Sequence, residues 1–274
     1  MKLCFHTIVY SPFPQWVPCY TLEETLTRLA RIGYRAVELA GVRPHAWYRD
    51  FDSSRKLRIK KLLSDLEMEV SGITPVIAPL FNPASVDAAE RKDSIEYLKG
   101  CAELSAELGG RFITCSAGYR VFGDPPDEAY KRSAEALRIL GEYGRTLGID
   151  IALEPCWTGA TNIVHRSDQA VVLADGTGLD NIGFAMDSCN VYLERESIYD
   201  VIRNYGSRLV NVHLEDVNAG GDRLVPGTGI LPMEDILAQL RHTGYDGYIC
   251  VEMLRENDPD RVAYQAYKYL KDRL

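Results

Sequence analysis

The sequence predicts a single (β/α)8 barrel that takes in residues 1–274. Three observations support this fold class. Eight short apolar segments alternate with amphipathic ones, and a glycine recurs where an amphipathic segment passes into the next apolar one. The chain length of 274 residues is close to the roughly 250 that such a barrel needs. Because no linker or low-complexity stretch divides the chain, we expect one domain.

The predicted strands are short and rich in Val, Ile or aromatic residues, as is typical of parallel strands buried on both faces. In chain order they are Leu3–Ile8, Ala36–Leu39, Glu69–Thr74, Phe112–Ser116, Asp150–Glu154, Ile182–Asp187, Leu209–His213 and Tyr248–Met253. The predicted helices carry apolar residues at helical spacing, for example Leu22, Leu26 and Leu29. They are Leu22–Arg31, Leu57–Leu66, Ala88–Leu108, Asp127–Leu147, Ser167–Ala174, Ile198–Asn204, Met233–Arg241 and Pro259–Leu274.

A glycine marks the passage from a helix to the next strand in four of the repeats. The left-handed backbone conformation that follows the last helical turn suits glycine, which has no Cβ. The four junctions are Gly33-Tyr34, Gly109-Gly110, Gly148-Ile149 and Gly244-Tyr245. Their recurrence indicates one repeated strand and helix unit.

The amino-acid composition indicates which kind of partner and which cellular compartment to expect. The net charge of −8 disfavours nucleic acid as a partner, because binding of phosphate backbones needs clustered Lys and Arg. The seven cysteines are scattered without a C-x-x-C pair, which is typical of reduced thiols in a cytoplasmic protein. The first apolar run is broken by Ser11 and by prolines, so neither a signal peptide nor a membrane span is predicted. We expect a cytoplasmic protein that acts on a small molecule.

Ionisable side chains end four consecutive predicted strands: Glu154, Asp187, His213 and Glu252, separated by 33, 26 and 39 residues. Each interval is long enough for one β/α unit, so parallel strands would bring all four to the same carboxyl edge of the barrel. Ionisable groups that converge there are costly unless a cation holds them. Three carboxylates and one imidazole suit Mn²⁺ first, with Mg²⁺, Co²⁺ or Zn²⁺ as alternatives.

Other residues near this edge are candidates of lower rank, each with a structural alternative. Arg223 either reaches a substrate oxygen or is a surface-loop arginine. His6 and Glu38, late in the first two strands, either contact substrate or satisfy local hydrogen bonds. Asp216 is a candidate partner of a metal ligand or of Arg223. Candidates for an apolar wall against the substrate, or for loop packing, are Tyr10, Trp16 and Trp47.

The stretch from Leu153 to Met253 carries a resemblance to a known family. It contains L-E-P, then D-S-C-N after G-F-A-M, then V-H-L-E-D, D-R-L-V-P-G-T-G and G-Y-D-G. These motifs resemble those of the xylose-isomerase-like barrel superfamily, and the similarity extends over nearly the whole chain. That superfamily includes sugar-phosphate isomerases, ketose 3-epimerases, hydroxypyruvate isomerases, inosose isomerases and dehydratases, and apurinic endonucleases. Its members often form dimers or tetramers, so the resemblance leaves a homo-oligomer open.

The resemblance implies both a metal site and a reaction. In the epimerases and isomerases, residues matching Glu154, Asp187, His213 and Glu252 bind one divalent ion. The two matching glutamates also exchange protons with opposite faces of the substrate, by way of an enediolate. The resemblance therefore implies a metal-dependent isomerase or epimerase of a sugar or keto-polyol, with Glu154 and Glu252 as its acid and base.

Three positions depart from the family pattern or refine it. Many relatives have a histidine where this chain has Asn190, whose amide can hydrogen-bond substrate but cannot titrate. The ketohexose 3-epimerases have a glutamate at the place of Ala160. Asn162 lies in a stretch that resembles inosose-isomerase-like relatives, in which an amide approaches the substrate. These positions count against an ordinary ketohexose 3-epimerase.

The sequence leaves alternative functions open. A dehydratase or lyase of a keto-sugar or inosose would use the same metal and begin with the same proton abstraction. A noncatalytic metabolite-binding barrel would keep the metal as structure. An apurinic endonuclease with three zinc ions is disfavoured because the chain has only five histidines. No phosphate-binding G-x-x-x-x-G-K motif occurs, which slightly favours an unphosphorylated substrate.

Overall fold

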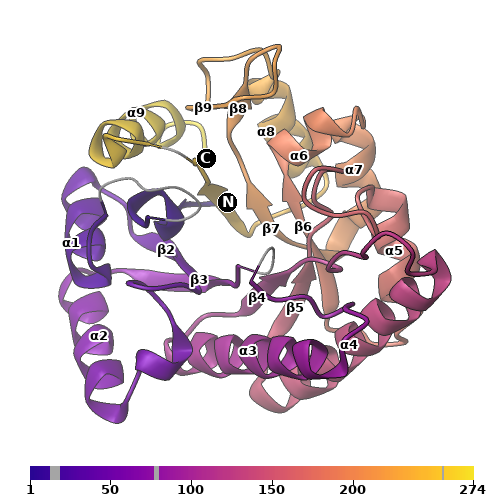
Figure 1. Cartoon of the computed structure of the whole chain (residues 1–274). Helices are drawn as coiled ribbons and strands as arrows, with labels where there is room; N and C mark the ends of the chain where they lie inside the picture. Colours follow the sequence, from indigo (N-terminus) through magenta and orange to yellow (C-terminus); the bar gives the residue numbers. More distant parts are fainter. Residues whose placement is uncertain (13–18, 77–79, 255) are drawn as a thin grey trace.

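Eight parallel strands close into a barrel in the computed structural model, which describes residues 1–12, 19–76, 80–254 and 256–274 (Figure 1). The strands neighbour one another in the order β1-β10-β7-β6-β5-β4-β3-β2, so the predicted (β/α)8 fold is confirmed. Their bounds are β1 Lys2–His6, β2 Ala36–Ala40, β3 Glu69–Thr74, β4 Phe112–Cys115, β5 Asp150–Leu153, β6 Ile182–Asp187, β7 Leu209–His213 and β10 Tyr248–Val251.

Helices surround the barrel and return the chain from one strand to the next (Figure 1). They are α1 Leu22–Ile32, α2 Ser53–Asp65, α3 Ala88–Glu107, α4 Pro126–Leu147, α5 Ser167–Asp175, α6 Ser188–Leu193, α7 Ile198–Tyr205, α8 Met233–His242 and α9 Pro259–Leu270. All four predicted junction glycines adopt positive φ: Gly33 at 128°, Gly109 at 84°, Gly148 at 69° and Gly244 at 76°. No helix in the described ranges is long and apolar enough to cross a membrane.

Side-chain alternation along the strands divides the barrel interior into an apolar and a polar part. A cluster of buried residues from six strands fills the apolar part: Cys4, Ala36, Phe112, Ala152, Ala185, Tyr248 and Cys250. Residues two apart in a strand face the same way, so the residue two positions after each of these also points into the barrel. In most strands that residue is polar, for example His6, Glu38 and Thr114. These polar side chains collect at the carboxyl ends of the strands, where the candidate site lies.

Two elements near the carboxyl ends were not predicted. The short helix α6 begins directly after β6, where the Asp187 carboxylate accepts a hydrogen bond from the Asn190 N–H at 2.7 Å and caps the first turn. A small antiparallel hairpin, β8 Asp216–Val217 and β9 Arg223–Leu224, follows β7. It projects above the barrel beside α6 in Figure 1 and carries Arg223 back toward the strand ends.

Candidate active site

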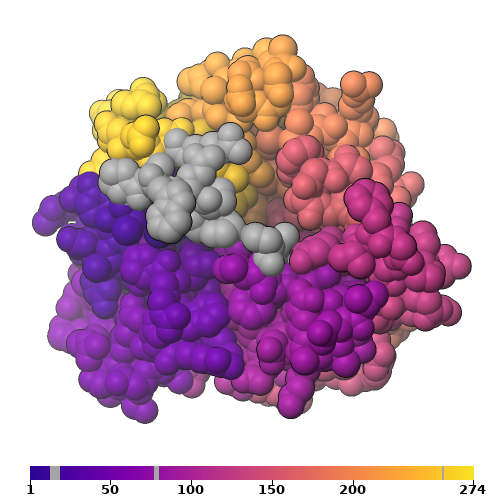
Figure 2. All heavy atoms as spheres, viewed as in Figure 1, coloured from indigo at the N-terminus to yellow at the C-terminus, as the bar shows by residue number. Residues whose placement is uncertain are grey.

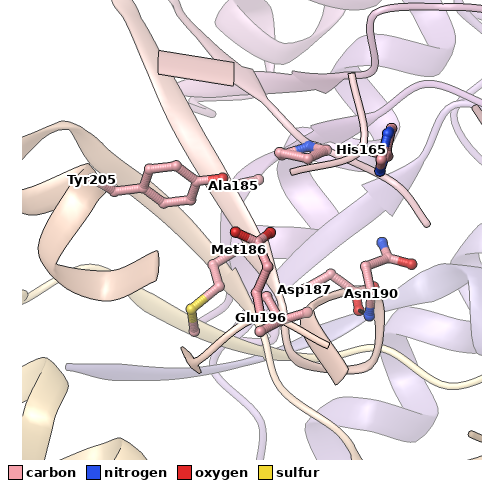
Figure 3. Close-up of a pocket in the computed structure, with 9 residues that line it drawn as sticks. His165, Ala185, Met186, Asp187, Asn190, Glu196 and Tyr205 are labelled. Carbon is pink, nitrogen blue, oxygen red and sulfur yellow. Dashed lines mark hydrogen bonds between the residues drawn. The ribbon is translucent and has the colours of Figure 1, made fainter. Parts of the chain in front are cut away.

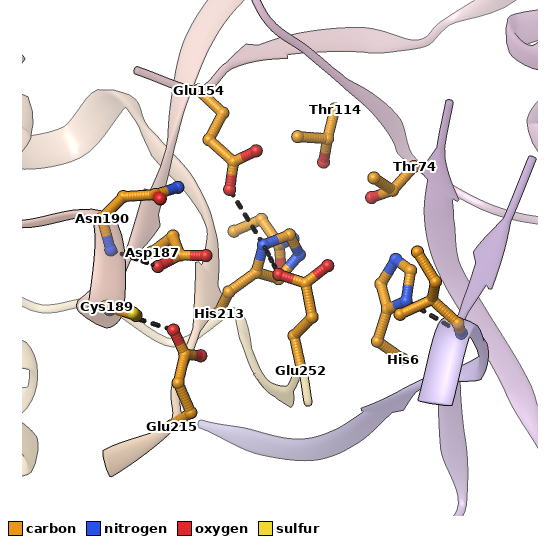
Figure 4. Close-up of polar contacts among 12 residues, drawn as sticks. His6, Thr74, Thr114, Glu154, Asp187, Cys189, Asn190, His213, Glu215 and Glu252 are labelled. Atoms are coloured by element: carbon orange, nitrogen blue, oxygen red, sulfur yellow. Dashed lines mark hydrogen bonds and ion pairs between the residues drawn. The ribbon is translucent and has the colours of Figure 1, made fainter. Parts of the chain in front are cut away.

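The four predicted metal ligands come together at the carboxyl edge of the barrel (Figure 4). One ligand atom from each of Glu154, Asp187, His213 and Glu252 lies within 4.8 Å of the others. Asp187 and His213 are the last residues of β6 and β7, whereas Glu154 and Glu252 directly follow β5 and β10. Because β10, β7, β6 and β5 are consecutive neighbours in the barrel, residues far apart in the chain form one compact group.

The imidazole of His213 is held between carboxylates on both of its nitrogens. Its Nδ1 lies 3.0 Å from Glu154 Oε1 and 3.4 Å from Glu252 Oε2. Its Nε2 lies 3.1 Å from Glu38 Oε2, and the Asn211 amide donates to the same Glu38 oxygen at 2.8 Å. Burial opposes a charged imidazole, but the facing carboxylates of Glu38, Glu252 and Glu154 raise the pKa of His213 well above its ordinary value. The ring therefore presents Nδ1 to the candidate ligands and Nε2 to Glu38.

Arg223 reaches from β9 into the group and bridges its carboxylates. Its Nη2 donates to Asp187 Oδ2 at 2.6 Å, and its Nη1 donates to Glu215 Oε1 at 2.7 Å and lies 3.3 Å from Glu252 Oε2. Burial alone would raise the pKa of Asp187, but the Arg223 guanidinium and nearby hydrogen bonds lower it below its ordinary value. Arg223 therefore contacts two candidate ligands and keeps Asp187 ionised.

Glu154 and Glu252 differ from Asp187 in the direction in which their surroundings move the pKa. Burial raises the pKa of both carboxyls, and although His213 counteracts this, neighbouring carboxylates add to the rise. A carboxyl whose pKa is moved toward neutrality can both take and return a proton at physiological pH. Asp187, with its pKa lowered, does not share this property.

His6 and Glu38 both contact His213 and are fully buried. Nδ1 of His6 accepts a hydrogen bond from the Ile8 N–H at 3.1 Å, and its Nε2 has no hydrogen-bond partner among the described residues. Burial lowers the pKa of His6 to about 3. The His6 ring meets the His213 ring edge-on, with centroids 5.6 Å apart. Glu38 and His6 are therefore buried contacts of His213 and do not face open solvent.

Two of the predicted contacts differ from what the structure contains. The Asp216 carboxylate accepts hydrogen bonds from the backbone N–H groups of Gly227, Gly229 and Leu231, so it holds the loop after β9 instead of Arg223 or a ligand. Asn162 is exposed, and its amide oxygen and nitrogen both bond the backbone of Arg120, at 2.8 and 3.0 Å. Asn162 therefore braces two loops against each other and does not line the site.

Of the two roles predicted for Tyr10 and Trp47, the structure shows the packing of loops. Tyr10 is buried and donates its hydroxyl to Asp260 Oδ1 at 2.8 Å, so it ties the first loop to α9. Trp47 stacks on Tyr97 and Phe81, with ring centroids 5.3 and 6.1 Å apart. Trp16 lies outside the described residues. Tyr10 and Trp47 therefore serve in loop packing.

Glu215 is the residue that sequence reasoning missed. Its Oε1 accepts hydrogen bonds from Arg223 and from the Cys189 N–H at 2.9 Å, and burial raises its pKa well above the ordinary value. The alternation along V-H-L-E-D could have identified it, because residues two apart face the same way and Glu215 is two after His213. Asn190 lies beside Asp187 and next to a cavity that opens from the site.

The donor set fits a divalent cation. Three buried carboxylates and one imidazole nitrogen converge around a common point, and oxygen-rich sets with one nitrogen suit hard divalent ions. The negative field that raises the pKa of His213 would equally attract a metal ion to Nδ1. Glu154, Asp187, His213 and Glu252 could therefore hold one. His6, Glu38 and His213 form a second buried group whose ligand atoms lie as close together, but it offers only one carboxylate.

A separate small cavity behind β6 is too small for a sugar. It measures about 10 Å³ and is lined by His165, Glu196, Tyr205 and the β6 residues Ala185 to Asp187 (Figure 3). A volume of that size holds about one water molecule. His165 Nδ1 itself is 2.7 Å from Glu194 Oε2, which ties the loop after β5 to the end of α6.

Comparison with known proteins assigns the family. Residues 26–273 match the xylose isomerase-like TIM barrel family, and the chain belongs to it. The chain is 26% identical over 249 residues to fructoselysine 3-epimerase of Escherichia coli, covering 89% of this chain and 90% of that protein. It is 27% identical over 258 residues to a putative hydroxypyruvate isomerase of Streptomyces coelicolor, covering 89% of each.

Solved structures agree on the fold. The D-psicose 3-epimerase of Clostridium cellulolyticum, solved with D-tagatose, superposes with a TM-score of 0.85 over 100% of this chain and 99% of that one, at 18% sequence identity. The relatives found by sequence include 3-epimerases and isomerases. The endonuclease alternative has no counterpart among the relatives reported above.

Proposed function

We propose that the protein is a divalent-metal-dependent isomerase or epimerase that moves a proton at a carbon next to the carbonyl of a sugar or keto-polyol. The observation that carries this proposal is the convergence of Glu154 and Glu252, both with raised pKa, on a group that can hold a metal. Family membership and the similarity to an epimerase and a putative isomerase support it.

Glu154, Asp187, His213 and Glu252 would hold the ion, with Mn²⁺ as the first choice for this donor set. A bound ion polarises the carbonyl and an adjacent hydroxyl of the substrate, which makes the intervening C–H more acidic. Glu38 accepts a hydrogen bond from Nε2 of His213 and so keeps Nδ1 free as a ligand.

Two carboxylates perform the proton transfer. One of Glu154 and Glu252 removes the proton from the substrate carbon, and the other returns a proton to the opposite face or to the neighbouring carbon. They approach His213 Nδ1 from different strands, β5 and β10, so a substrate bound between them presents a face to each. Arg223 positions the Glu252 carboxylate, and the Asn190 amide is available to hydrogen-bond a substrate oxygen.

The test is exchange of a substrate C–H with deuterium from solvent. The Mn²⁺-loaded protein is incubated in D₂O with ketoses, inososes and hydroxypyruvate, and each product is identified by NMR and mass spectrometry. We expect exchange on at least one substrate, lost in Glu154→Gln and in Glu252→Gln. Glu135→Gln, which removes an exposed carboxylate on α4, is the matched control and should exchange normally. Absence of exchange on the whole panel would refute the proposal, and loss of water from a substrate would favour a dehydratase instead.

A further inference from the structure

A cavity of about 360 Å³ lies beside the candidate metal ligands. Two of its described lining residues also contact a ligand, because the Arg223 guanidinium and the Asn190 N–H both donate to the Asp187 carboxylate. Trp157, on the loop after β5, is a third lining residue. Figure 2 shows the face of the molecule on which the strand ends lie, hollowed near its centre. Trp157 therefore borders the same cavity as two residues that contact the ligand group.

Trp157 presents a large apolar surface to solvent although its surroundings hold it in place. Its side chain is 43% exposed. Its carbonyl oxygen accepts hydrogen bonds from the N–H groups of Ala160 and Thr161, at 2.8 and 3.2 Å. The indole lies against the backbone of Gly159, where a Cβ would overlap the ring. Because the ring is held before a ligand arrives, it loses little conformational freedom on binding and offers a favourable contact surface.

The residue after Trp157 is held by a carboxylate from a neighbouring helix. Oε1 of Glu194 accepts hydrogen bonds from the Thr158 N–H at 2.6 Å and from the Thr158 hydroxyl. Oε2 of Glu194 lies 2.7 Å from Nδ1 of His165, near the end of the same loop. Glu194 is the C-terminal cap of α6, the helix that begins directly after Asp187. Glu194 therefore ties the loop that carries Trp157 to α6.

The surroundings of Glu194 favour the ionised carboxylate. Its side chain is only 8% exposed, and burial alone would raise its pKa, but the hydrogen bonds from Thr158 and His165 lower that pKa below the ordinary value. An ionised acceptor makes stronger hydrogen bonds than a neutral one. Glu194 is neither one of the candidate metal ligands nor one of the described residues that line the cavity. Any effect of Glu194 on a substrate would therefore pass through the loop.

We propose that Trp157 contacts the substrate of the isomerase or epimerase reaction and that Glu194 is the residue that positions it. The indole lies against the bound substrate on the side of the cavity, and Glu194 fixes the place of the indole relative to α6. This inference rests on the proposed function, because it places the reacting carbons of the substrate at Glu154 and Glu252. Glu194 itself does not touch the substrate and acts through Trp157.

A double-mutant cycle tests this dependence. Deuterium exchange by the Mn²⁺-loaded protein gives kcat and KM for the ketose, inosose or hydroxypyruvate that exchanges fastest. Trp157→Ala should lower kcat/KM roughly tenfold, mainly through KM, because it removes a contact made to substrate and transition state alike. Glu194→Ala should lower kcat/KM roughly fivefold, again through KM. The double variant should be no worse than Trp157→Ala alone, whereas independent effects would multiply to roughly 50-fold. Glu194→Gln, whose amide oxygen can still accept from the Thr158 N–H, should keep most of the activity.

Glu196→Ala is the matched control. Glu196 follows Glu194 by two residues, is also 8% exposed, and accepts hydrogen bonds from the Ser167 N–H at 3.0 Å and the Ser167 hydroxyl at 2.8 Å. These partners belong to α5 and not to the segment around Trp157. Glu196→Ala should therefore lower the Tm about as much as Glu194→Ala but leave KM unchanged. An equal rise of KM in both variants, or additive effects in the double variant, would overturn the inference.

Fluorine NMR of protein labelled with fluorotryptophan follows the indole directly. The chain has three tryptophans, and Trp157→Phe assigns the resonance of interest. The probes are D-fructose, scyllo-inosose and hydroxypyruvate, added to the protein loaded with Mg²⁺ because Mn²⁺ is paramagnetic. At least one probe should shift the Trp157 resonance at saturation. In the free protein, Glu194→Ala should shift or broaden this resonance, and Glu196→Ala should leave it unchanged.

The two measurements separate this inference from the proposed function. Exchange of a substrate C–H with no change in the Trp157 resonance would refute the contact and leave the isomerase or epimerase proposal intact. A change in the resonance without exchange on any probe would count against the proposed reaction and support the contact. If no probe exchanges and none shifts the resonance, both proposals are refuted.

Discussion

Replacing Glu38 by Gln should weaken metal binding although Glu38 is not one of the four proposed ligands. Both oxygens of Glu38 lie within hydrogen-bonding distance of His213 Nε2, at 3.1 and 3.2 Å. His213 lowers the pKa of Glu38 far enough to offset the effect of burial, so Glu38 is ionised. The side chain therefore fixes the proton of His213 on Nε2 and increases the basicity of Nδ1.

The magnitude follows from the change in this one hydrogen bond. A hydrogen bond to a charged acceptor contributes about 1.5–3 kcal/mol, and one to a neutral amide contributes about 0.5–1.5 kcal/mol. The difference of about 1–2 kcal/mol corresponds to roughly a 5- to 30-fold loss of metal affinity. The expected loss agrees with the roughly 10- to 100-fold effect usual for partners of metal-bound histidines. Gln is nearly the same size as Glu, so the barrel interior should keep its packing.

The assay is a titration of the metal-free protein with Mn²⁺, followed by calorimetry or by the EPR signal of free Mn²⁺. Circular dichroism verifies that Glu38→Gln is folded, and Glu135→Gln on α4 serves as the control for removal of one negative charge. A Glu38→Gln protein that is folded and binds Mn²⁺ as tightly as the parent would refute the role given to Glu38. Weaker binding in the control as well would point to a general charge effect instead.

Three further changes follow from the same contacts. Arg223→Gln removes a guanidinium that contacts two candidate ligands. The rate of deuterium exchange, measured at saturating Mn²⁺, should therefore fall roughly 100-fold. A decrease of less than about threefold would contradict the role given to Arg223. Gly229→Ala would place a methyl group against the Asp216 carboxylate. The free energy of unfolding, measured by calorimetry, should therefore fall by about 1–3 kcal/mol. An unchanged Tm would contradict the contacts between Asp216 and this loop. Because burial raises the pKa of Glu154 and Glu252, protons should compete with Mn²⁺ at a higher pH than ordinary glutamates allow. Affinity for Mn²⁺ should therefore fall as pH decreases from 8 to roughly 5, and a constant affinity over that range would contradict the raised pKa values.

The barrel and the four converging side chains were predictable because they depend on local patterns. Strand ends are marked by apolar runs, and parallel pairing brings the ends of neighbouring strands together whatever the loops do. His213 and Asp187 end their strands as predicted, and Glu154 and Glu252 lie one residue beyond theirs. The arrangement of these side chains followed from topology alone.

The loops were less predictable because their conformation depends on contacts from distant parts of the chain. Asp216 and Glu215 are neighbours in sequence, yet only Glu215 faces Arg223, since the chain turns outward into the β8–β9 hairpin at Asp216. Asn162 was expected in the site, but its amide is engaged by the backbone of Arg120, 42 residues away in the chain. No property of either residue alone determines these pairings.

The balance of charge in the site explains why Glu215, rather than Asp216, belongs with Arg223. Arg223 reaches the carboxylates from the hairpin, and without a buried acceptor on the β7 side its guanidinium would have no partner opposite Asp187. Glu215 supplies that acceptor, and burial raises its pKa well above the ordinary value. The remaining carboxylates outnumber Arg223, and the excess raises the pKa of His213. A proton on Nδ1 of His213 and a divalent cation at the same point would both compensate that excess, so we expect metal binding to displace this proton.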